Sequence, residues 1–237
     1  MAILSEIVRF VLPPTKVKLT EFLKLRQHIS RSYNVHDQYC GYITPVKSSH
    51  LLVKENEMCW VIQWPQGTRH HAQIAELRAQ LKELTSEPTS SNDDGTGGGA
   101  TSLLFQFEDS QVPELNKALE APVCEFAIIN LTPNHPRAES DPGFIKSMHK
   151  TYTDCYGAAG FRGGNWSYAL NTNETYGTAT AALEEMIAPD ERRLACYYLG
   201  WDGVEVSVFF TTTTITTTIV VFGPPWPTFL YMGGHYS

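Results

Sequence analysis

Histidine and tyrosine at helical spacing are the residues of this sequence best suited to acid–base chemistry. His149 and Tyr152 stand three positions apart, so that on a helix both side chains lie on one face. An imidazole exchanges protons near neutral pH, and a phenol hydroxyl steadies a developing enolate or phenolate. The pair is therefore a candidate for proton transfer, with His149 as the base. The alternative is a half-buried helix histidine beside a core tyrosine.

Two further residues are candidates for acid–base work, His36 and Glu205. His36 precedes Asp37, whose carboxylate is a candidate to orient the imidazole. Adjacent residues rarely face each other, however, and a solvated loop explains the same residues. Glu205 follows Asp202 by three positions, which is the spacing of a helix N-cap and its reciprocal partner. Capping therefore explains Glu205 without any reaction.

Ring-stacking and charge-pairing residues form a second group of candidates, for substrate binding. Trp64, Trp166 and Trp201 are expected on strands, where aromatic rings either line a cavity or fill a core. Arg162 is a candidate partner for a ligand carboxylate or phenolate, or for the end of the preceding helix. His235 is a candidate to point into the interior of the protein if the C-terminal tail forms a last strand. Otherwise it belongs to a frayed end.

Sequence motifs of several common enzyme classes are missing. No GxSxG elbow follows a strand, no GxGxxG motif supports a nicotinamide or flavin site, and no HExxH or comparable spacing supports a catalytic metal. The glycine-rich stretch 97–99 lacks the Lys-Ser/Thr of a phosphate-binding loop. We therefore expect neither a metal nor a cofactor.

Composition and charge restrict the class of protein and its partners. The 237 residues are 42% hydrophobic and 18% charged, which is typical of a globular protein. The net charge of −7 argues against a nucleic acid or an anionic membrane as partner. Five cysteines show no CxxC pair, and neither a signal peptide nor a membrane-spanning segment is apparent. These features favour a reducing, cytoplasmic compartment.

Hydrophobic periodicity gives the first half of the chain the order β-α-β-β-α-β, which is that of a ferredoxin-like fold. A Ser/Gly-rich stretch, 87–102, is expected to be a flexible loop within this half. A short helix at Val112–Leu119 leads to the second half. The predicted elements are the strand Ile3–Val11, the helix Leu19–Ser32, the strands Gly41–Ile43 and Met58–Trp64, the helix His71–Leu84 and the strand Leu103–Phe107.

The second half of the chain begins with the same order of elements. After Glu205 the pattern requires a helix and a last strand, for which Thr228–Met232 is a candidate. The Thr-rich stretch 208–222 is either that helix or a strand, because β-branched residues disfavour helices. The predicted elements are the strand Cys124–Leu131, the helix Phe144–Ala159, the strand Asn165–Leu170, a short helical insert at Ala181–Met186 and the strand Leu194–Trp201.

Two stretches of the chain share one plan, in which a strand ends in tryptophan and a turn leads to a helix. They are MCWVIQWPQGTRHH at 58–71 and CYYLGWDGVEVS at 196–207. The repetition indicates an internal duplication, with a first unit at 1–121 and a second at 122–237. Each unit buries one sheet face under its helices and leaves the other bare. The predicted fold is therefore α+β, with two tandem ferredoxin-like units whose bare sheets meet in an intramolecular α/β barrel.

The chain resembles the tandem form of the dimeric α/β-barrel superfamily. Its second half is similar to members found in fungal secondary-metabolite clusters, whereas the first half agrees in topology only. The residues that carry the resemblance are the Phe144–Ala159 helix, Arg162-Gly163-Gly164 with Trp166, Glu191-Arg192-Arg193, and Gly200-Trp201-Asp202 with Val204-Glu205. The resemblance implies an interior cavity that binds an aromatic or polyketide-like molecule, and chemistry without a cofactor.

Three hypotheses of function follow. The first is a cofactor-independent isomerase, cyclase or dehydratase on a phenolic or polyketide intermediate, for example closing a chalcone to a flavanone. The second is a cofactor-free monooxygenase on the same class of substrate. The third is a non-catalytic small-molecule-binding or stress-response protein on the same scaffold, because a fold alone does not determine a function. Under each hypothesis the partner is a small molecule and the protein is a monomer or a homodimer.

Overall fold

The computed structural model describes residues 2–44, 53–65, 71–85, 99–131, 142–179, 186–204 and 215–221. Several predictions concern residues outside these ranges and stay predictions. They concern Glu205, His235, most of the loop 87–102, the helical insert before Met186, the helix after Glu205 and the last strand Thr228–Met232.

The first half has the predicted order of elements. Thr15 caps the first helix, since its hydroxyl oxygen accepts a hydrogen bond from the Lys18 amide at 3.3 Å. The second strand begins at Gln38, inside a stretch predicted as a loop, because Gln38 already pairs with Ile62 of the third strand. The elements are β1 (Ile3–Val11), α1 (Lys16–Tyr33), β2 (Gln38–Thr44), β3 (Glu57–Pro65), α2 (His71–Thr85) and β4 (Thr101–Phe107).

In the second half the largest errors in predicted boundaries concern the long helix and the strand that follows it. The long helix ends at Cys155 rather than Ala159, and a turn follows to Gly160, whose φ is 78°. The next strand begins at Phe161 rather than Asn165. The elements are α3 (Val112–Leu119), β5 (Val123–Asn130), α4 (Pro142–Cys155), β6 (Phe161–Tyr168), β7 (Thr178–Ala179), the 3-10 helix η2 (Pro189–Glu191), β8 (Leu194–Trp201) and β9 (Ile215–Val221).

Residues 215–221 of the Thr-rich stretch form the strand β9, and the rest of that stretch lies outside the described residues. The β9 sequence ITTTIVV consists of β-branched residues throughout, which favour the extended backbone. It pairs antiparallel with β5 on one side and with β2 on the other. Because β2 belongs to the first half and β5 to the second, β9 joins the two halves by main-chain hydrogen bonds.

The nine strands follow one another in the order β6-β8-β5-β9-β2-β3-β1-β4-β7. Within the first four-strand group β1 lies between β3 and β4, which is the strand order of a ferredoxin-like fold. In the second group β5 likewise lies between β8 and β9. An isolated bridge between Phe105 and Ala169 brings β4 close to the end of β6, but the strands of the described residues do not close into a barrel.

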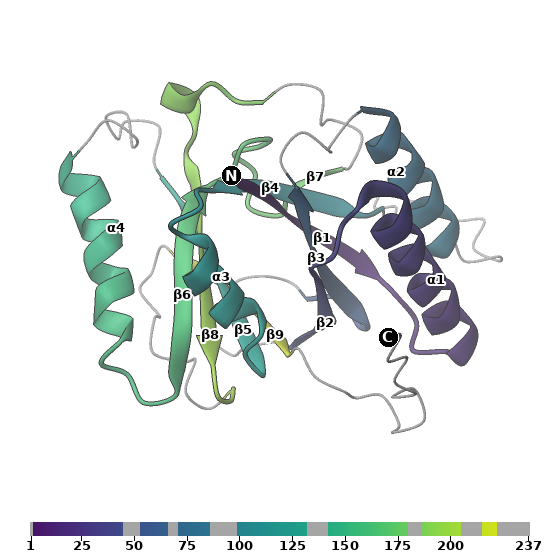
Figure 1. Cartoon of the computed structure of the whole chain (residues 1–237), viewed down its shortest axis with the longest axis horizontal. Helices are drawn as coiled ribbons and strands as arrows, with labels where there is room; N and C mark the ends of the chain where they lie inside the picture. Colours follow the sequence, from purple (N-terminus) through teal and green to yellow (C-terminus); the bar gives the residue numbers. More distant parts are fainter. Residues whose placement is uncertain are drawn as a thin grey trace.

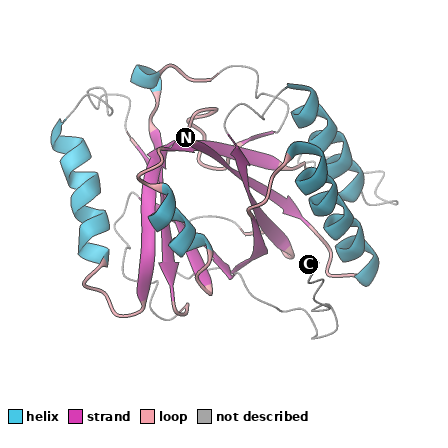
Figure 2. Cartoon of the chain, in the orientation of Figure 1, coloured by secondary structure: helices cyan, strands magenta, loops and turns pink. Residues whose placement is uncertain are grey.

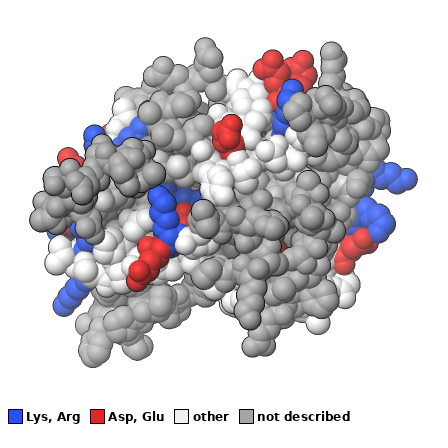
Figure 3. Space-filling view, turned by 180° about the vertical axis from the view of Figure 1, so that it is seen from behind, with Lys and Arg blue, Asp and Glu red and all other residues white. Residues whose placement is uncertain are grey.

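The helices flank the strands on opposite sides. In Figures 1 and 2, α1 and α2 lie together on one side and α4 lies on the other. One buried cluster, with Phe22 and Trp60 among its members, packs beneath α1 and α2, and another, with Met148 and Tyr197, packs beneath α4. Within the described residues, no helix combines the length and the apolar character that a membrane crossing requires. The molecule seen from behind shows acidic and basic side chains of the described residues scattered among uncharged ones (Figure 3).

The hollow expected between the two bare sheet faces is filled at its centre by side chains. The ring of Tyr198 contacts three phenylalanines edge to face, with centroids 4.9 to 5.7 Å apart. The helix α3, predicted only as a connection, lies against β8, where a Cβ on Gly200 would come within 2.6 Å of the Ala118 Cα. The linker helix thus takes up interior space. We call the buried residues between the sheets the interior cluster. It includes Leu115, Ala118 and Leu119 of α3, and Phe105, Phe107, Phe126 and Tyr198 of the strands.

Candidate functional site

A chain of hydrogen bonds joins α3 to α4 and forms the candidate site. The Tyr152 and Tyr156 hydroxyls lie 2.6 Å apart, and the Tyr156 hydroxyl donates to Glu114 Oε2 at 2.7 Å. The Lys117 ammonium donates to the other oxygen of the same carboxylate. We call these four residues the acid–base cluster. It contains Tyr152, one of the predicted catalytic residues, together with three residues that the sequence did not single out.

A glycine on β6 allows the two helices to approach each other. Gly163 has a φ of 154°, and a Cβ there would lie 2.8 Å from the Lys117 Cβ and 2.9 Å from Glu114 Oε2. The pairing of β6 with β8 is irregular between Phe161 and Gly163, as in a β-bulge. The Phe161 ring packs against Tyr156 at a centroid distance of 5.1 Å. The site therefore depends on the absence of a side chain at position 163.

Electrostatics determine the direction of the hydrogen bonds in the acid–base cluster. Partial burial, together with the hydrogen bonds to its neighbours, raises the pKa of Tyr156, and partial burial raises the pKa of Tyr152. Burial opposes ionisation of Glu114, but the hydrogen bonds from Lys117 and Tyr156 outweigh it and lower the pKa of this carboxyl. At neutral pH both phenols are protonated and the carboxylate is charged. Tyr152 then donates to Tyr156, and its oxygen keeps a lone pair for a ligand hydroxyl.

His149 lies one turn away from Tyr152 on α4, but no hydrogen bond between the two is found among the described residues. The imidazole is exposed and packs edge to face on Trp166, with ring centroids 5.6 Å apart. Trp166 is 8% exposed, and its buried Nε1 has no hydrogen-bond partner in the described part of the chain. The strand β6 thus places Trp166 Nε1, a donor without an acceptor in the described part of the chain, beside the exposed imidazole of His149.

The remaining predicted catalytic residue of the described chain, His36, lies apart from the cluster. It follows the end of α1 in the first half, is exposed, and its Nε2 lies 2.9 Å from Asn34 Oδ1. The imidazole is thus oriented by Asn34 rather than by Asp37. The solvated-loop interpretation fits this geometry.

All three predicted stacking residues, Trp64, Trp166 and Trp201, belong to the buried clusters beneath the helices. Trp64 packs beneath α1 and α2, and its Nε1 donates to Glu6 Oε2 at 2.8 Å. Trp201 packs in the cluster beneath α4, and its Nε1 donates to Glu125 Oε2 at 2.9 Å. All three rings therefore serve as core residues, away from the space between the sheets.

Arg162 is engaged with a neighbouring carboxylate. Its Nε donates to Oδ1 of Asp202, and both side chains are exposed. Asp202, predicted as a helix cap, therefore has an ion-pair role on this surface, and its amide donates to the Gly160 carbonyl at 2.8 Å. A ligand anion would have to compete with Asp202 for Arg162.

A second group of titratable side chains, unnoticed in the sequence, joins α1 to α2. His28 Nε2 lies 2.9 Å from Glu76 Oε1, and Ser32 Oγ lies 3.3 Å from His28 Nδ1. Tyr33 donates to the other oxygen of Glu76. His28 and Ser32 stand four apart on α1, which is visible in the sequence, but only the packing of the helices brings Glu76 to them.

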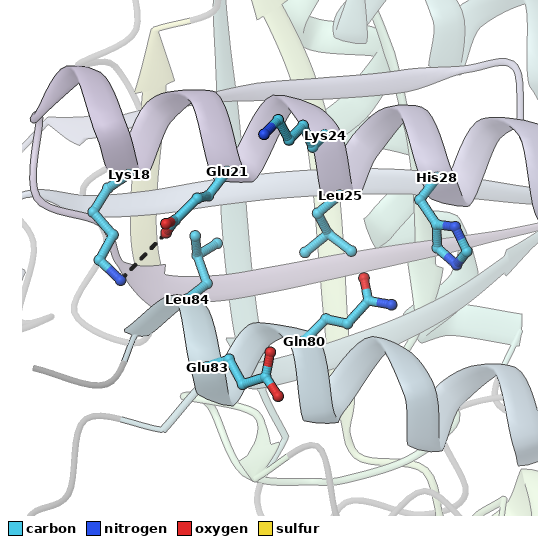
Figure 4. Close-up of a pocket in the computed structure, with 8 residues that line it drawn as sticks. All are labelled: Lys18, Glu21, Lys24, Leu25, His28, Gln80, Glu83 and Leu84. Carbon is cyan, nitrogen blue, oxygen red and sulfur yellow. Dashed lines mark ion pairs between the residues drawn. The ribbon is translucent and has the colours of Figure 1, made fainter.

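This order of serine, histidine and glutamate resembles that of a hydrolase, but the surroundings do not support one. Ser32 lies in the last turn of α1, where the unpaired backbone groups of a helix are carbonyl oxygens rather than N–H donors. An oxyanion needs donors. The adjacent groove between the helices, about 570 Å³ in volume, is lined mainly by long charged and polar side chains (Figure 4), namely Lys18, Glu21, Lys24, Leu25, His28, Gln80, Glu83 and Leu84.

Neither group is a metal centre. Among the residues that the structure describes, no three His, Cys, Asp or Glu side chains are gathered as metal ligands. The cysteines Cys59, Cys124 and Cys196 lie fully buried in the interior cluster as small apolar side chains, and burial raises their pKa values.

Comparisons with known proteins give a likeness of fold only. No protein-family model matches the chain, and no curated protein matches its sequence. Among solved structures, a protein described as a candidate chlorite dismutase aligns over 94% of this chain and 96% of its own, with a TM-score of 0.43 and 9% identity. A variant of the chlorite dismutase of Candidatus Nitrospira defluvii aligns over 94% of this chain and 92% of its own, with a TM-score of 0.46 and 10% identity. Likenesses of this size show no shared activity.

Proposed function

We propose that this protein is a cofactor-independent isomerase or cyclase that moves a proton within a phenolic or polyketide-like molecule. The observation that carries the proposal is the chain of hydrogen bonds from Tyr152 through Tyr156 to Glu114. Such a chain accepts a proton at one end and releases one at the other without any external redox partner. The acid–base cluster is therefore the proposed catalytic group.

The expected chemistry can be written for the closure of a hydroxylated chalcone. The ligand hydroxyl donates to the Tyr152 oxygen, and a proton shifted along the two phenols reaches Glu114. The freed ligand oxygen forms a bond to the β-carbon of the enone, and the enolate that results takes a proton at its α-carbon. That proton comes from the reverse shift along the cluster, which returns Glu114 to its carboxylate form. The ligand gains and loses no atoms.

We further propose that the chain consists of two tandem ferredoxin-like units, 1–121 and 122–237, that together form a barrel of the dimeric α/β-barrel superfamily. The same strand order in both halves supports this proposal. So do two matching side-chain pairs. Trp64 lies opposite a residue of β1 that stands two positions before Glu6, its hydrogen-bond acceptor, and Trp201 lies opposite a residue of β5 that stands two positions before Glu125.

The setting of the enzyme remains part of the proposal. We place it in secondary metabolism of the fungal type and in the cytoplasm, acting as a monomer or a homodimer on a small aromatic or polyketide-like molecule. The resemblance noted in the second half supports the metabolic setting. The five free thiols are compatible with a reducing compartment.

The non-catalytic alternative is favoured by one observation. The interior cluster around Tyr198 is filled by side chains, so that the space in which a buried reaction was expected is reduced. A ligand held at the surface between α3 and α4 would be bound without exclusion of water, which weakens electrostatic catalysis.

The test is an anaerobic incubation of the whole protein with an ortho-hydroxylated chalcone, followed by chromatography and mass spectrometry. We expect a product of unchanged mass and new retention time, formed about a hundredfold more slowly by Tyr152→Phe and Tyr156→Phe. Tyr33→Phe, which removes a tyrosine hydroxyl that donates to a glutamate outside the cluster, serves as the matched control. A product that gains oxygen in air would support the monooxygenase instead. Saturable binding without product would support the binding protein.

A further inference from the structure

A second cavity, of about 270 Å³, opens at the end of β1 that points away from α3. The α3 end is marked by Gln63, which pairs with Ser5 and donates from Nε2 to Asn116 of α3 at 3.2 Å. Arg9 stands four residues further along β1, about 13 Å away at the rise of a strand. The cavity is lined by Arg9, Phe10, Val11, Lys54, Glu57, Gly99, Thr101 and Tyr176.

Arg9 and Glu57 are the buried charged residues of this cavity, and Arg9 has one nitrogen without a partner in the described part of the chain. Arg9 is 6% exposed, and its Nε and Nη2 lie 3.0 Å and 2.8 Å from Glu57 Oε1. Its third nitrogen, Nη1, is buried and has no partner in the described part of the chain. A buried N–H group without an acceptor lowers the stability of the folded protein. A ligand oxygen that accepts from Nη1 would remove this cost.

Glu57 is not the acceptor of Arg9 Nη1, because each of its oxygens accepts from other donors. Oε1 accepts from Arg9, and Oε2 accepts from the Lys54 amide at 3.0 Å. The turn that holds Lys54 against Glu57 is closed by the Glu57 amide, which donates to the Lys54 carbonyl at 3.1 Å, with Asn56 at a φ of 58°. The Glu57 carboxylate is thus held in place by Arg9 and by the Lys54 amide.

The charges that line the cavity favour an anion. The two cations, Arg9 and Lys54, face a single carboxylate, and the hydroxyl-bearing residues Thr101 and Tyr176 stand at the same wall. The volume is near the lower end of the range of ligand pockets, so that the occupant must be small. Phe10 and Val11 add apolar surface to the lining.

We propose that this cavity binds a small organic carboxylate with an apolar body, whose oxygens accept hydrogen bonds from Arg9 Nη1 and whose charge is balanced by Lys54. The geometry suits a guanidinium, which presents several donors in one plane, better than an ammonium. The site shares no residue with the acid–base cluster, so that it stands whether or not that cluster is catalytic.

The experiment titrates the full-length protein with benzoate and follows the guanidinium resonances of the arginines by NMR, with thermal unfolding as a second readout. Benzamide, which has the same shape without the charge, is the matched ligand. We expect saturable shifts of the Arg9 resonance and a rise in Tm with benzoate, and binding of benzamide at least about tenfold weaker.

Two variants separate the site from general surface charge. Arg9→Lys keeps a cation beside Glu57 but removes the additional donor, and we expect it to weaken benzoate at least about tenfold. Arg162→Lys changes an exposed, paired arginine elsewhere and should alter the affinity less than about twofold. If Arg9→Lys does not fold, the shift of the Arg9 resonance in the unaltered protein still decides.

Four results would overturn the proposal: no saturable shift of Arg9 with benzoate, equal affinity for benzamide, an unchanged affinity in folded Arg9→Lys, or tighter binding of inorganic phosphate than of benzoate. The last would show an inorganic anion site in place of a carboxylate site. Loss of chalcone turnover has no bearing on these readouts, which keeps this test distinct from that of the proposed function.

Discussion

The buried Glu6–Trp64 pair of the first half and the Glu125–Trp201 pair of the second half are built alike but have different neighbours. Both carboxylates are 1% exposed, and each accepts a hydrogen bond from an indole. The Trp64 ring packs against Tyr33 of α1 with ring centroids 6.2 Å apart, whereas the Trp201 ring packs against Phe161 of β6 with centroids 5.2 Å apart. The two halves thus share a buried hydrogen bond from an indole to a carboxyl group, in different surroundings.

The tyrosine–glutamate contacts of the two halves differ in what holds them. Tyr33 and Glu76 belong to α1 and α2, which lie side by side over one group of strands (Figure 1). Tyr156 and Glu114 belong to α4 and α3, and they meet at β6 where Gly163 has no side chain. The first contact rests on a helix pair, and the second rests on one glycine. The second is therefore the more vulnerable to a single substitution.

The largest expected effect comes from removing the indoles. Trp64→Ala and Trp201→Ala each delete a fully buried ring and leave a buried carboxyl without its donor. We expect each to lower the free energy of unfolding by about 3–5 kcal/mol, measured by urea denaturation. Similar losses in the two halves would support the duplication. A loss below about 1 kcal/mol at either site would show that the two pairs are not equivalent.

A smaller effect is expected from filling the space at Gly163. In Gly163→Ala the new Cβ meets Lys117 and Glu114, and the backbone lies at a φ that side chains rarely adopt. We expect a loss of about 2 kcal/mol in unfolding free energy and loss of the turnover assigned to the acid–base cluster. Gly203→Ala is the control, because nothing lies within 4 Å of a Cβ there. Full activity in Gly163→Ala would remove the cluster from the mechanism.

The pH dependence of stability tests the second half alone. Burial raises the pKa of Glu125 to about 8, against the hydrogen bond from Trp201, while the unfolded value is near 4.5. Between these values the folded protein holds a proton that the unfolded chain has released. The contribution of Glu125 to the free energy of unfolding is therefore fully present below about pH 4.5. It falls as the pH rises towards 8, by at most about 1.4 kcal/mol per pH unit.

Urea denaturation at several pH values measures this slope, and Glu125→Gln is the variant that should flatten it. The amide oxygen of glutamine still accepts from Trp201, so that the hydrogen bond is preserved while the titration is removed. An equal slope in Glu125→Gln would assign the pH dependence to another group.

The smallest effect is expected from the phenol hydroxyls. Tyr33→Phe and Tyr156→Phe each remove one donor to a glutamate at the surface. We expect each to cost about 0.5–1.5 kcal/mol in urea denaturation. Only Tyr156→Phe should lower turnover. Equal loss of turnover in both variants would mean that the cluster between α1 and α2 takes part in the reaction.

The sequence predicted the strands and helices whose apolar pattern is uninterrupted. Strands β1 and β8 have the predicted bounds, and so does the short helix α3. These segments owe their conformation to local periodicity and to their turn residues, which a sequence displays directly. The errors in β2, α4 and β6 fall at boundaries, where pairing with a distant strand decides which residue is the last.

The candidate site was predictable in part. Tyr152 was identified from its spacing to His149, but its partners Tyr156, Glu114 and Lys117 were not. No local pattern relates α4 to α3 across β6, and the contact exists only because Gly163 leaves room for it. The tryptophans were rightly placed on strands, yet whether a strand residue faces helices or the opposite sheet depends on how the layers stack.

The amino-acid sequence by itself determined the order of strands and helices in the first half, the repeated strand pattern that ends in Trp64 and in Trp201, and the lack of the usual cofactor motifs, because these depend on residues close together in the chain. Tertiary structure alone decided that α3 fills the interior, that Glu114 meets Tyr156, and that Arg9 keeps an unused nitrogen beside a cavity. Each of these depends on residues far apart in the sequence whose distance is set by packing.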